Sequence, residues 1–202
     1  MARYIGPKCK KCRGMGEKLF LKGEKCFTDA CVLPKRSSRE TVRGKKLSHY
    51  SLQLKEKQKL KAIYGLLENQ FHLTFERARK KNPAEQLLVH LERRLDNTIY
   101  RLGFADSRPQ ARVIIRHGHV LVNDKKVNVP SYEISPNERI QIKDEKGKGL
   151  VKKILTDKEP TPVDWLALDK DNMIGTVIRC PTREDVKDIP VNTQLIVELY
   201  SK

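Results

Sequence analysis

The stretch from 107 to 130 reads SRPQARVIIRHGHVLVNDKKVNVP and decides the fold of the middle of the chain. It predicts a helix over 108–117, because Ser107 is a typical N-cap residue and Gly118 a typical stop. Two apolar runs separated by the polar residues NDKK follow, and this pattern predicts a strand, a tight turn and a second strand. The expected unit is therefore a short helix followed directly by a hairpin.

The predicted helix carries its cations on one side. Arg108, Arg112 and Arg116 are four residues apart and form one stripe, while apolar residues occupy the side that can face a core. Guanidinium groups match the geometry of phosphate oxygens. The helix exit and the turn add His117, His119, Asn123, Lys125 and Lys126. The pattern predicts a concave basic surface, and a stripe of solvated arginines is the alternative.

Four cysteines near the start follow the pattern C-x2-C-x13-C-x4-C, at Cys9, Cys12, Cys26 and Cys31. Two close pairs within 23 residues are typical of a tetrahedral thiolate metal site. We predict a structural zinc ion, since four thiolates leave no open position for catalysis. An iron–sulfur cluster is one alternative, and cysteines that bind no metal or form a redox pair are another. Cys180 follows an apolar run and is predicted to be a buried core thiol.

The chain has 202 residues and a formal net charge of +17. The excess is uneven: the net charge is +13 over residues 1–64, +5 over 65–128 and −1 over 129–202. A nucleic acid neutralises such an excess, so we expect RNA or DNA to bind the first two thirds. The last third is expected to face solvent or another protein. We see no secretory signal and no apolar run of about 20 residues, so the protein is expected to be soluble and cytosolic.

Apolar periodicity and capping residues predict most of the remaining elements. Helices are expected over 51–64, 68–81, 84–102 and 193–200, and strands over 139–143, 165–168 and 175–179. The segment 150–155 is ambiguous. The loop between the cysteine pairs predicts a small hairpin or knuckle, and 34–50 is a polar, basic linker that we expect to be ordered only when bound.

Several motifs together resemble one family. The pattern SRxxAxxxIxxGxVxVNxxxV from residue 107 resembles a small RNA-binding fold first named from a ribosomal protein. The preceding LExRLDNxxYRLGFA, from residue 91, resembles that protein itself. Further matches are RYxGP from residue 3, EKQKLxxIYG from residue 56 and PVN from residue 190. The chain therefore resembles the bacterial-type small-subunit ribosomal protein four family over essentially its whole length.

The resemblance implies an α+β fold in three parts. Residues 1–45 form a basic four-cysteine metal-binding segment and linker, and 46–91 form a helical domain completed by 189–202. Residues 92–188 hold an inserted RNA-binding domain of two helices and short antiparallel strands, with the strands that follow it. Many members have a Pro/Gly-rich stretch where this chain has 37–43, and many lack the cysteines, so the metal is predicted from spacing alone.

The resemblance also implies a function. The family binds a helix junction in the 5′ domain of small-subunit ribosomal RNA, nucleates subunit assembly and affects translational fidelity through a neighbouring ribosomal protein. Some members repress their own messenger RNA. We expect no catalysis, no membrane partner and no DNA partner. The predicted RNA contacts are Arg3, Lys8, Lys10, Lys11, Lys35, Arg36, Arg43, Lys45, Lys46, His49, Tyr50, Lys55, Lys57, Arg101, Arg108, Arg112, Arg116, His117, His119, Asn123, Lys125 and Lys126.

Two other functions compete with this interpretation. The sequence RRLD at 93–96 resembles the core motif of pseudouridine synthases, in which an aspartate attacks a nucleoside. Here the motif lies before the RNA-binding fold and within a predicted helix, so we expect Asp96 to pair with an arginine or to hold Asn97. The second alternative is a zinc-containing RNA chaperone or messenger repressor that acts outside the ribosome.

Overall fold

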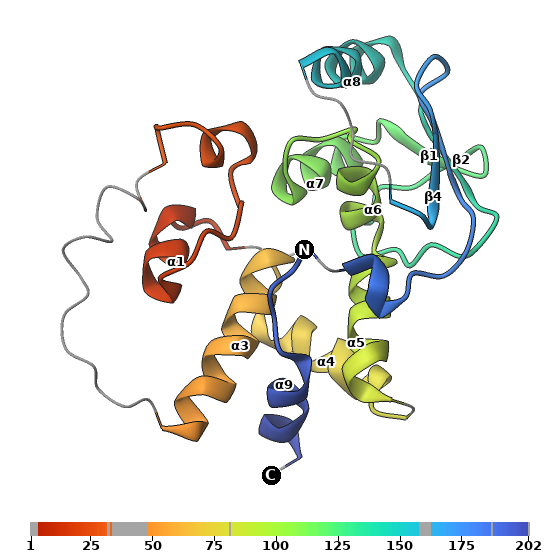
Figure 1. Ribbon diagram of the computed structural model, residues 1–202. Coiled ribbons are helices and arrows are strands. Elements are labelled where there is room, and N and C mark those ends of the chain that lie inside the picture. The colour runs from red at the N-terminus through yellow and green to blue at the C-terminus, as the bar shows by residue number, and fades with distance from the viewer. Residues whose placement is uncertain are drawn as a thin grey trace. The chain divides into compact units, whose positions relative to one another are not determined.

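The computed structural model describes residues 4–31, 33, 48–80, 82–157, 163–186 and 188–201 (Figure 1). The chain divides into two compact units, unit 1 (Met1–Leu87 with Ile189–Lys202) and unit 2 (Leu88–Asp188). Most of the predicted linker 34–50 lies outside the described residues. The predicted RNA contacts that also lie outside them are Arg3, Lys35, Arg36, Arg43, Lys45 and Lys46.

Unit 1 begins with a helix that the sequence did not predict, and only its last residues enter the loop for which a hairpin or knuckle was expected. Helix α1 (Lys8–Met15) contains the first cysteine pair and ends at Gly16 in the left-handed conformation, φ 71°. The short 3-10 turn η1 (Gly23–Cys26) follows. An ion pair of 2.5 Å between Lys59 Nζ and Glu17 Oε2 links this segment to helix α3 (His49–Ile63).

The end of the chain packs on α3. Helix α9 (Thr193–Tyr200) is capped as predicted, with Asn192 Oδ1 accepting from the Gln194 backbone N–H at 3.0 Å. Its Tyr200 ring stacks on Phe75 of helix α4 (Glu68–Ala78), with ring centroids 4.4 Å apart. Two hydrogen bonds join α9 to α3: Asn192 N to Glu56 Oε2 at 2.8 Å, and Gln53 Nε2 to Glu198 Oε2 at 3.1 Å.

The single helix predicted over 84–102 is wrong. The structure has two helices, α5 (Pro83–Glu92) and α6 (Leu95–Arg101), because Arg94 is extended with φ −66° and ψ 136°. The backbone groups at the break form hydrogen bonds with a distant loop. Leu95 N donates to Tyr132 O at 2.8 Å, and Ile134 N donates to Arg93 O at 2.8 Å. These tertiary hydrogen bonds replace helical ones, which local periodicity could not indicate.

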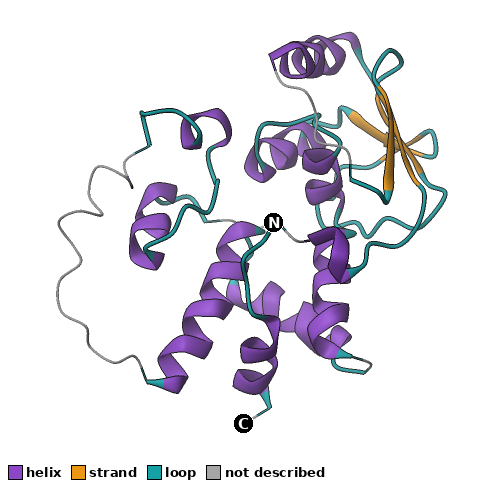
Figure 2. Cartoon of the chain, in the orientation of Figure 1, coloured by secondary structure: helices purple, strands orange, loops and turns teal. Residues whose placement is uncertain are grey.

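Unit 2 contains an antiparallel sheet of five strands, drawn in orange in Figure 2. The strand order is β2-β1-β3-β5-β4. The strands are β1 (Val120–Val122), β2 (Lys125–Lys126), β3 (Arg139–Ile142), β4 (Leu166–Asp169) and β5 (Ile174–Val177). The α+β prediction is confirmed for this unit, although β1 and β2 meet at a shorter turn than expected and the second strand is Lys125–Lys126 instead of the apolar run 127–130.

The two helices expected for this domain are α6 and α7 (Arg108–Arg116), and unit 2 contains a further helix, α8 (Glu145–Asp157), that the sequence did not predict. The ambiguous segment 150–155 therefore lies inside a helix. Val151 of α8 is buried in one core with Ile115 of α7 and Trp165 beside β4. Packing against apolar residues from distant parts of the chain therefore determines that this segment is a helix, which its own sequence pattern did not indicate.

Cys180 is exposed, so the prediction of a buried core thiol is wrong. The buried alternation of β5 ends at Val177, and Ile178 is already 55% exposed, so the chain has left the core before it reaches Cys180. In the described part of the chain, no helix combines the length and apolarity that crossing a bilayer requires.

Candidate nucleic-acid interface

The turn between β1 and β2 consists of two residues. Asn123 and Asp124 have positive φ, 48° and 62°, as two-residue hairpin turns of type I′ require, and Val122 pairs with Lys125. Lys125 and Lys126 therefore lie on β2, an edge strand, and not in the turn as predicted. Both lysines are exposed. Asn123 itself fixes the hairpin, since its Oδ1 accepts from the Arg139 backbone N–H at 2.9 Å.

A glycine brings the hairpin against the end of α7. Gly118 has φ +79°, and a Cβ at this position would lie 2.7 Å from the Nζ of Lys126. The Lys126 side chain therefore lies directly against Gly118. This close approach places an ammonium group at the exit of the helix that carries Arg116. Neither spacing nor composition could show this contact in advance.

The two histidines beside Gly118 lie close together, with ring centroids 5.9 Å apart. His119 Nδ1 lies 2.9 Å from both carboxylate oxygens of Asp144. The hydrogen bond from His119 lowers the pKa of Asp144, so the carboxylate stays charged and holds the ring. His117 is exposed. We define the hairpin surface as Arg116, His117, His119, Lys125 and Lys126.

The expected stripe of exposed arginines on α7 is wrong, because only Arg116 is exposed. Arg108 is 8% exposed, and its Nε donates to Asn97 Oδ1 at 2.7 Å. The Arg112 side chain is 13% exposed, and its Nε lies 2.6 Å from Asp96 Oδ2. Asp96 pairs with arginines, as expected, and this pairing turns the Arg112 guanidinium inward, while the hydrogen bond to Asn97 holds the Arg108 guanidinium inside. Their RNA contacts stay predictions.

Arg101, another predicted contact, also lies inside an ion-pair network. It bonds the buried Glu92, with Nε at 2.9 Å from Oε2, and Asp188, with Nη1 at 2.7 Å from Oδ2. Burial lowers the pKa of Arg101, but Glu92 and Asp188 outweigh it and raise this pKa well above its usual value. Its side chain is 9% exposed, so its first role is to hold α6 to α5 and to the segment that ends unit 2.

The predicted contacts in unit 1 divide into exposed and paired side chains. Lys10, His49 and Tyr50 are exposed, and Lys8 and Lys55 are half-buried. Lys11 Nζ lies 3.9 Å from the centre of the Tyr4 ring, a cation–π contact. Lys57 Nζ lies 2.5 Å from Glu68 Oε1. Two lysines, Lys57 and Lys61, lower the pKa of Glu68 to about 2 despite its partial burial, so Lys57 is neutralised within the fold.

The four cysteines of the N-terminal segment are reduced in the structure. Within the residues it describes, no three or more metal-ligating side chains are grouped so that they could hold an ion. The other three thiols nevertheless influence Cys12 electrostatically. Burial raises the pKa of Cys12, and Cys26, Cys9 and Cys31 raise it further. Four thiolates are suitable ligands for zinc. The predicted metal knuckle is not confirmed, because the described residues do not bring these cysteines together as a group of ligands.

Sequence reasoning missed the lysines of α8 as a basic surface. The sequence contained a signal for this surface: Val151 and Ile154 are three residues apart, which is helical spacing, and they are the buried side of the helix. This spacing would have placed Lys146 and Lys152 on the outer side. The low net charge of residues 129–202 concealed it, because an average over a long segment hides opposite charges that the fold separates.

The antiparallel sheet and the cationic surface of helix and hairpin place this chain in the class of nucleic-acid-binding proteins. Two family models match the chain: "S4 domain" over residues 93–140 and "Ribosomal protein S4/S9 N-terminal domain" over residues 3–93. Relatives described as small ribosomal subunit protein uS4 cover 100% of both chains. They include those of Thermosipho melanesiensis at 48% identity, Caldicellulosiruptor saccharolyticus at 50% and Thermotoga maritima at 47%. The chain belongs to the uS4 family of small ribosomal subunit proteins, which are structural proteins and not enzymes.

Proposed function

We propose that the chain binds ribosomal RNA as a constituent of the small ribosomal subunit in the bacterial cytoplasm. The observation that carries this proposal is the hairpin surface, where Lys126 lies against Gly118 and joins Arg116 and two histidines. Such a surface can neutralise adjacent phosphates on a folded RNA, which fixes register without reading sequence. The formal net charge of +17 gives the association its long-range attraction.

The finer function rests on the family to which the chain belongs. We propose that it is a primary binder of a helix junction in the 5′ domain, that it nucleates assembly, and that it affects fidelity through a neighbouring ribosomal protein. Repression of its own messenger RNA is part of the same proposal, since a messenger that imitates the junction would meet the same cations. A nucleoside-modifying role lacks support, because Asp96 is held between Arg94 and Arg112.

The hairpin surface can be tested with the double variant Lys125→Ala, Lys126→Ala. We expect weaker binding to a 5′-domain transcript and a salt slope about 1.4–1.8 smaller, since each lysine contributes one phosphate contact. The matched control removes the same charge from other exposed positions of unit 2, Lys170→Ala with Arg183→Ala. Filter binding over a salt series measures both slopes. If the two double variants bind alike, the hairpin surface does not contact RNA.

We also propose that zinc binds the four cysteines, supported by their spacing. Bound zinc would link α1 to η1 and supply the cross-link that such a small segment needs in place of a core. Cys26 is already buried, and its Sγ accepts from the Lys22 backbone N–H at 3.4 Å, so one corner of the site is ordered.

Metal content tests this directly. Native mass spectrometry should find about one zinc per chain, and Cys12→Ser should reduce this to about zero, because a tetrahedral site needs all four ligands. Cys180→Ser is the control, since this exposed thiol lies outside the set and the variant should keep its metal. Proteolysis of residues 8–31 should accelerate in Cys12→Ser only. Iron in place of zinc would favour the cluster, and full metal retention by Cys12→Ser would refute the site.

A further inference from the structure

Helix α8 lies beyond both family-model matches, which end at residues 93 and 140. It is anchored by its apolar face: Val151 and Ile154 are buried, and Gly147 packs closely on neighbouring side chains. A Cβ at Gly147 would lie 3.0 Å from His119 Cβ and 2.8 Å from Ile142 Cγ2. The first turns of α8 are therefore in contact with the hairpin surface through His119.

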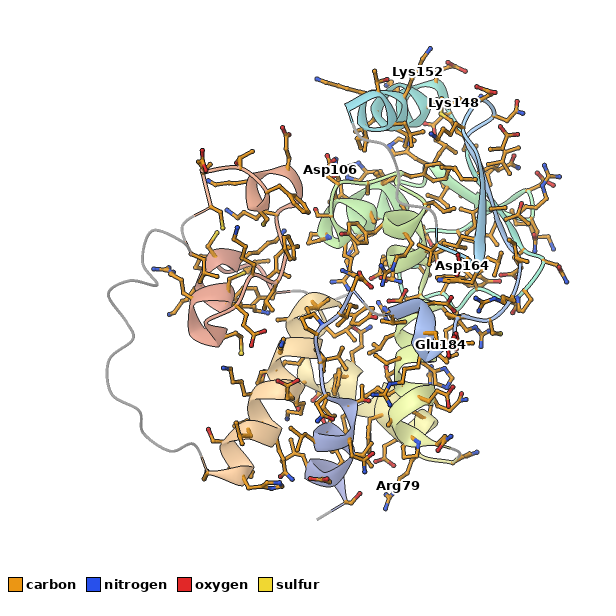
Figure 3. The ribbon with its side chains drawn as sticks, viewed as in Figure 1. Arg79, Asp106, Lys148, Lys152, Asp164 and Glu184 are labelled. Carbon is orange, nitrogen blue, oxygen red and sulfur yellow. The ribbon has the colours of Figure 1, made fainter. Side chains whose placement is uncertain are left out.

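The rest of α8 is covered with lysines. Lys146, Lys152 and Lys153 are exposed, and Lys148 is half-buried (Figure 3 labels Lys148 and Lys152). On a helix, Lys146 and Lys153 share one flank of the apolar face, and Lys148 and Lys152 share the other. Among the described side chains the only acid paired with them is Glu145, which lies 3.7 Å from Lys148. Lys146 and Lys152 therefore present uncompensated charge.

The sheet of unit 2 has two exposed lysines at one edge and two exposed aspartates at the other. Its order puts β2, with Lys125 and Lys126, at one edge and β4 at the other. The exposed Asp169 ends β4, and the exposed Asp171 lies in the turn that follows. Because Gly147 contacts His119 and Ile142, which belong to the β1 and β3 side, α8 extends the basic edge. The near-zero net charge of the last third thus conceals the four lysines of α8.

We propose that α8 is a second phosphate-binding element, which contacts the backbone of the same ribosomal RNA beside the hairpin surface. This inference rests on the proposed RNA-binding function. Lys146 and Lys152, one on each flank, are the contacting residues. Lysine ammonium groups on flexible stems bind phosphates as point charges and need no precise geometry, which suits the backbone of a folded RNA.

A protein partner fits α8 less well. The core of a protein interface is depleted of lysine and enriched in aromatic residues. The only large apolar side chain exposed on the described part of α8 is Leu150, at 45%. Around it the surface consists of lysine and glycine, including Gly149 with open space about its Cα. The charge of α8 is complementary to RNA, whereas its small apolar surface gives a protein little to bury.

The test compares two double variants of the full chain in binding to a 5′-domain transcript between 0.1 and 1 M salt. In Lys146→Ala with Lys152→Ala, we expect the slope of log affinity against log salt to fall by about 1.4–1.8, since each lost phosphate contact removes about 0.7–0.9. If the variant and the wild-type chain bind equally at 1 M salt, the variant should bind about 25–60-fold more weakly than the wild type at 0.1 M salt. The control Lys170→Ala with Arg183→Ala should keep the wild-type slope, and thermal unfolding should be unchanged in both.

The outcomes separate the two proposals. If the wild-type chain binds the transcript and the α8 variant keeps its slope, the role of α8 is refuted while the RNA-binding function stands. If the wild-type chain does not bind the transcript, the proposed function itself fails. An equal loss of slope in the control variant would mean that only total charge matters, and this too would overturn a site on α8. Restoring the slope with Lys146→Arg and Lys152→Arg would support it.

Discussion

Replacing Asp96 by alanine should lower the free energy of unfolding of unit 2 by about 3–5 kcal/mol. The Asp96 carboxylate is 2% exposed and holds two guanidinium groups. Arg94 approaches it with Nε at 3.1 Å from Oδ1 and Nη2 at 3.0 Å from Oδ2, and Arg112 approaches with Nε at 2.6 Å from Oδ2. Without the carboxylate, two largely buried cations remain near each other with no anion between them.

Urea unfolding followed by tryptophan fluorescence can measure this loss. The chain has a single tryptophan, Trp165, which is fully buried in the core of unit 2 and so reports on this unit. Asp171→Ala is the matched control, since it removes an exposed carboxylate and should change stability by no more than about 0.5 kcal/mol. Equal unfolding midpoints for the two variants would show that the Asp96 pairs contribute nothing to stability.

The same contacts change the meaning of Arg112→Ala. As a solvated phosphate ligand, Arg112 would be removable without structural effect. As a partner of the buried Asp96, it should destabilise unit 2 when replaced. A loss of RNA binding in Arg112→Ala therefore needs an unfolding curve beside it, whereas the exposed Arg116 allows a clean test of RNA contact.

Affinity for small-subunit ribosomal RNA should fall about 10³–10⁵-fold between 50 and 200 mM salt, the expectation for about 6–10 phosphate contacts. Arg116, Lys125 and Lys126 of the hairpin surface supply three of the required cations, and exposed side chains of unit 1 such as Lys10 add to them. Each bound phosphate releases condensed counterions, and added salt opposes that release.

The measurement is a filter-binding titration of the wild-type chain at constant temperature and magnesium concentration. An unrelated structured RNA of equal length is the control: its affinity should have a similar slope but be weaker at every salt concentration, because non-specific binding is almost wholly electrostatic. A nearly flat titration with the cognate RNA would contradict the electrostatic basis of the function. Equal affinity for both RNAs would mean that the protein binds RNA only through its positive charge and has no specific RNA-binding site.

Local patterns in the sequence determined the elements whose signals lie within one turn or one hairpin. Helix α7 begins after Ser107 and ends before Gly118 as predicted to within a residue, and α9 begins at its predicted cap, Asn192. Strands β3, β4 and β5 also lie where alternation placed them, within one or two residues at their ends. These features depend on backbone conformation and on neighbours a few residues apart, which a linear pattern records.

Only the tertiary structure decided which charges reach solvent. Asp96 lies 16 residues from Arg112, and Arg101 lies 87 residues from Asp188, so no periodic signal joins these partners. The break at Arg94, the exposure of Cys180 and the packing of α8 likewise depend on segments that are distant in the chain. The sequence determined how many cations the protein has and on which elements they lie. Folding determined which of them are neutralised inside, because an ion pair forms wherever burial would otherwise leave a charge without a partner.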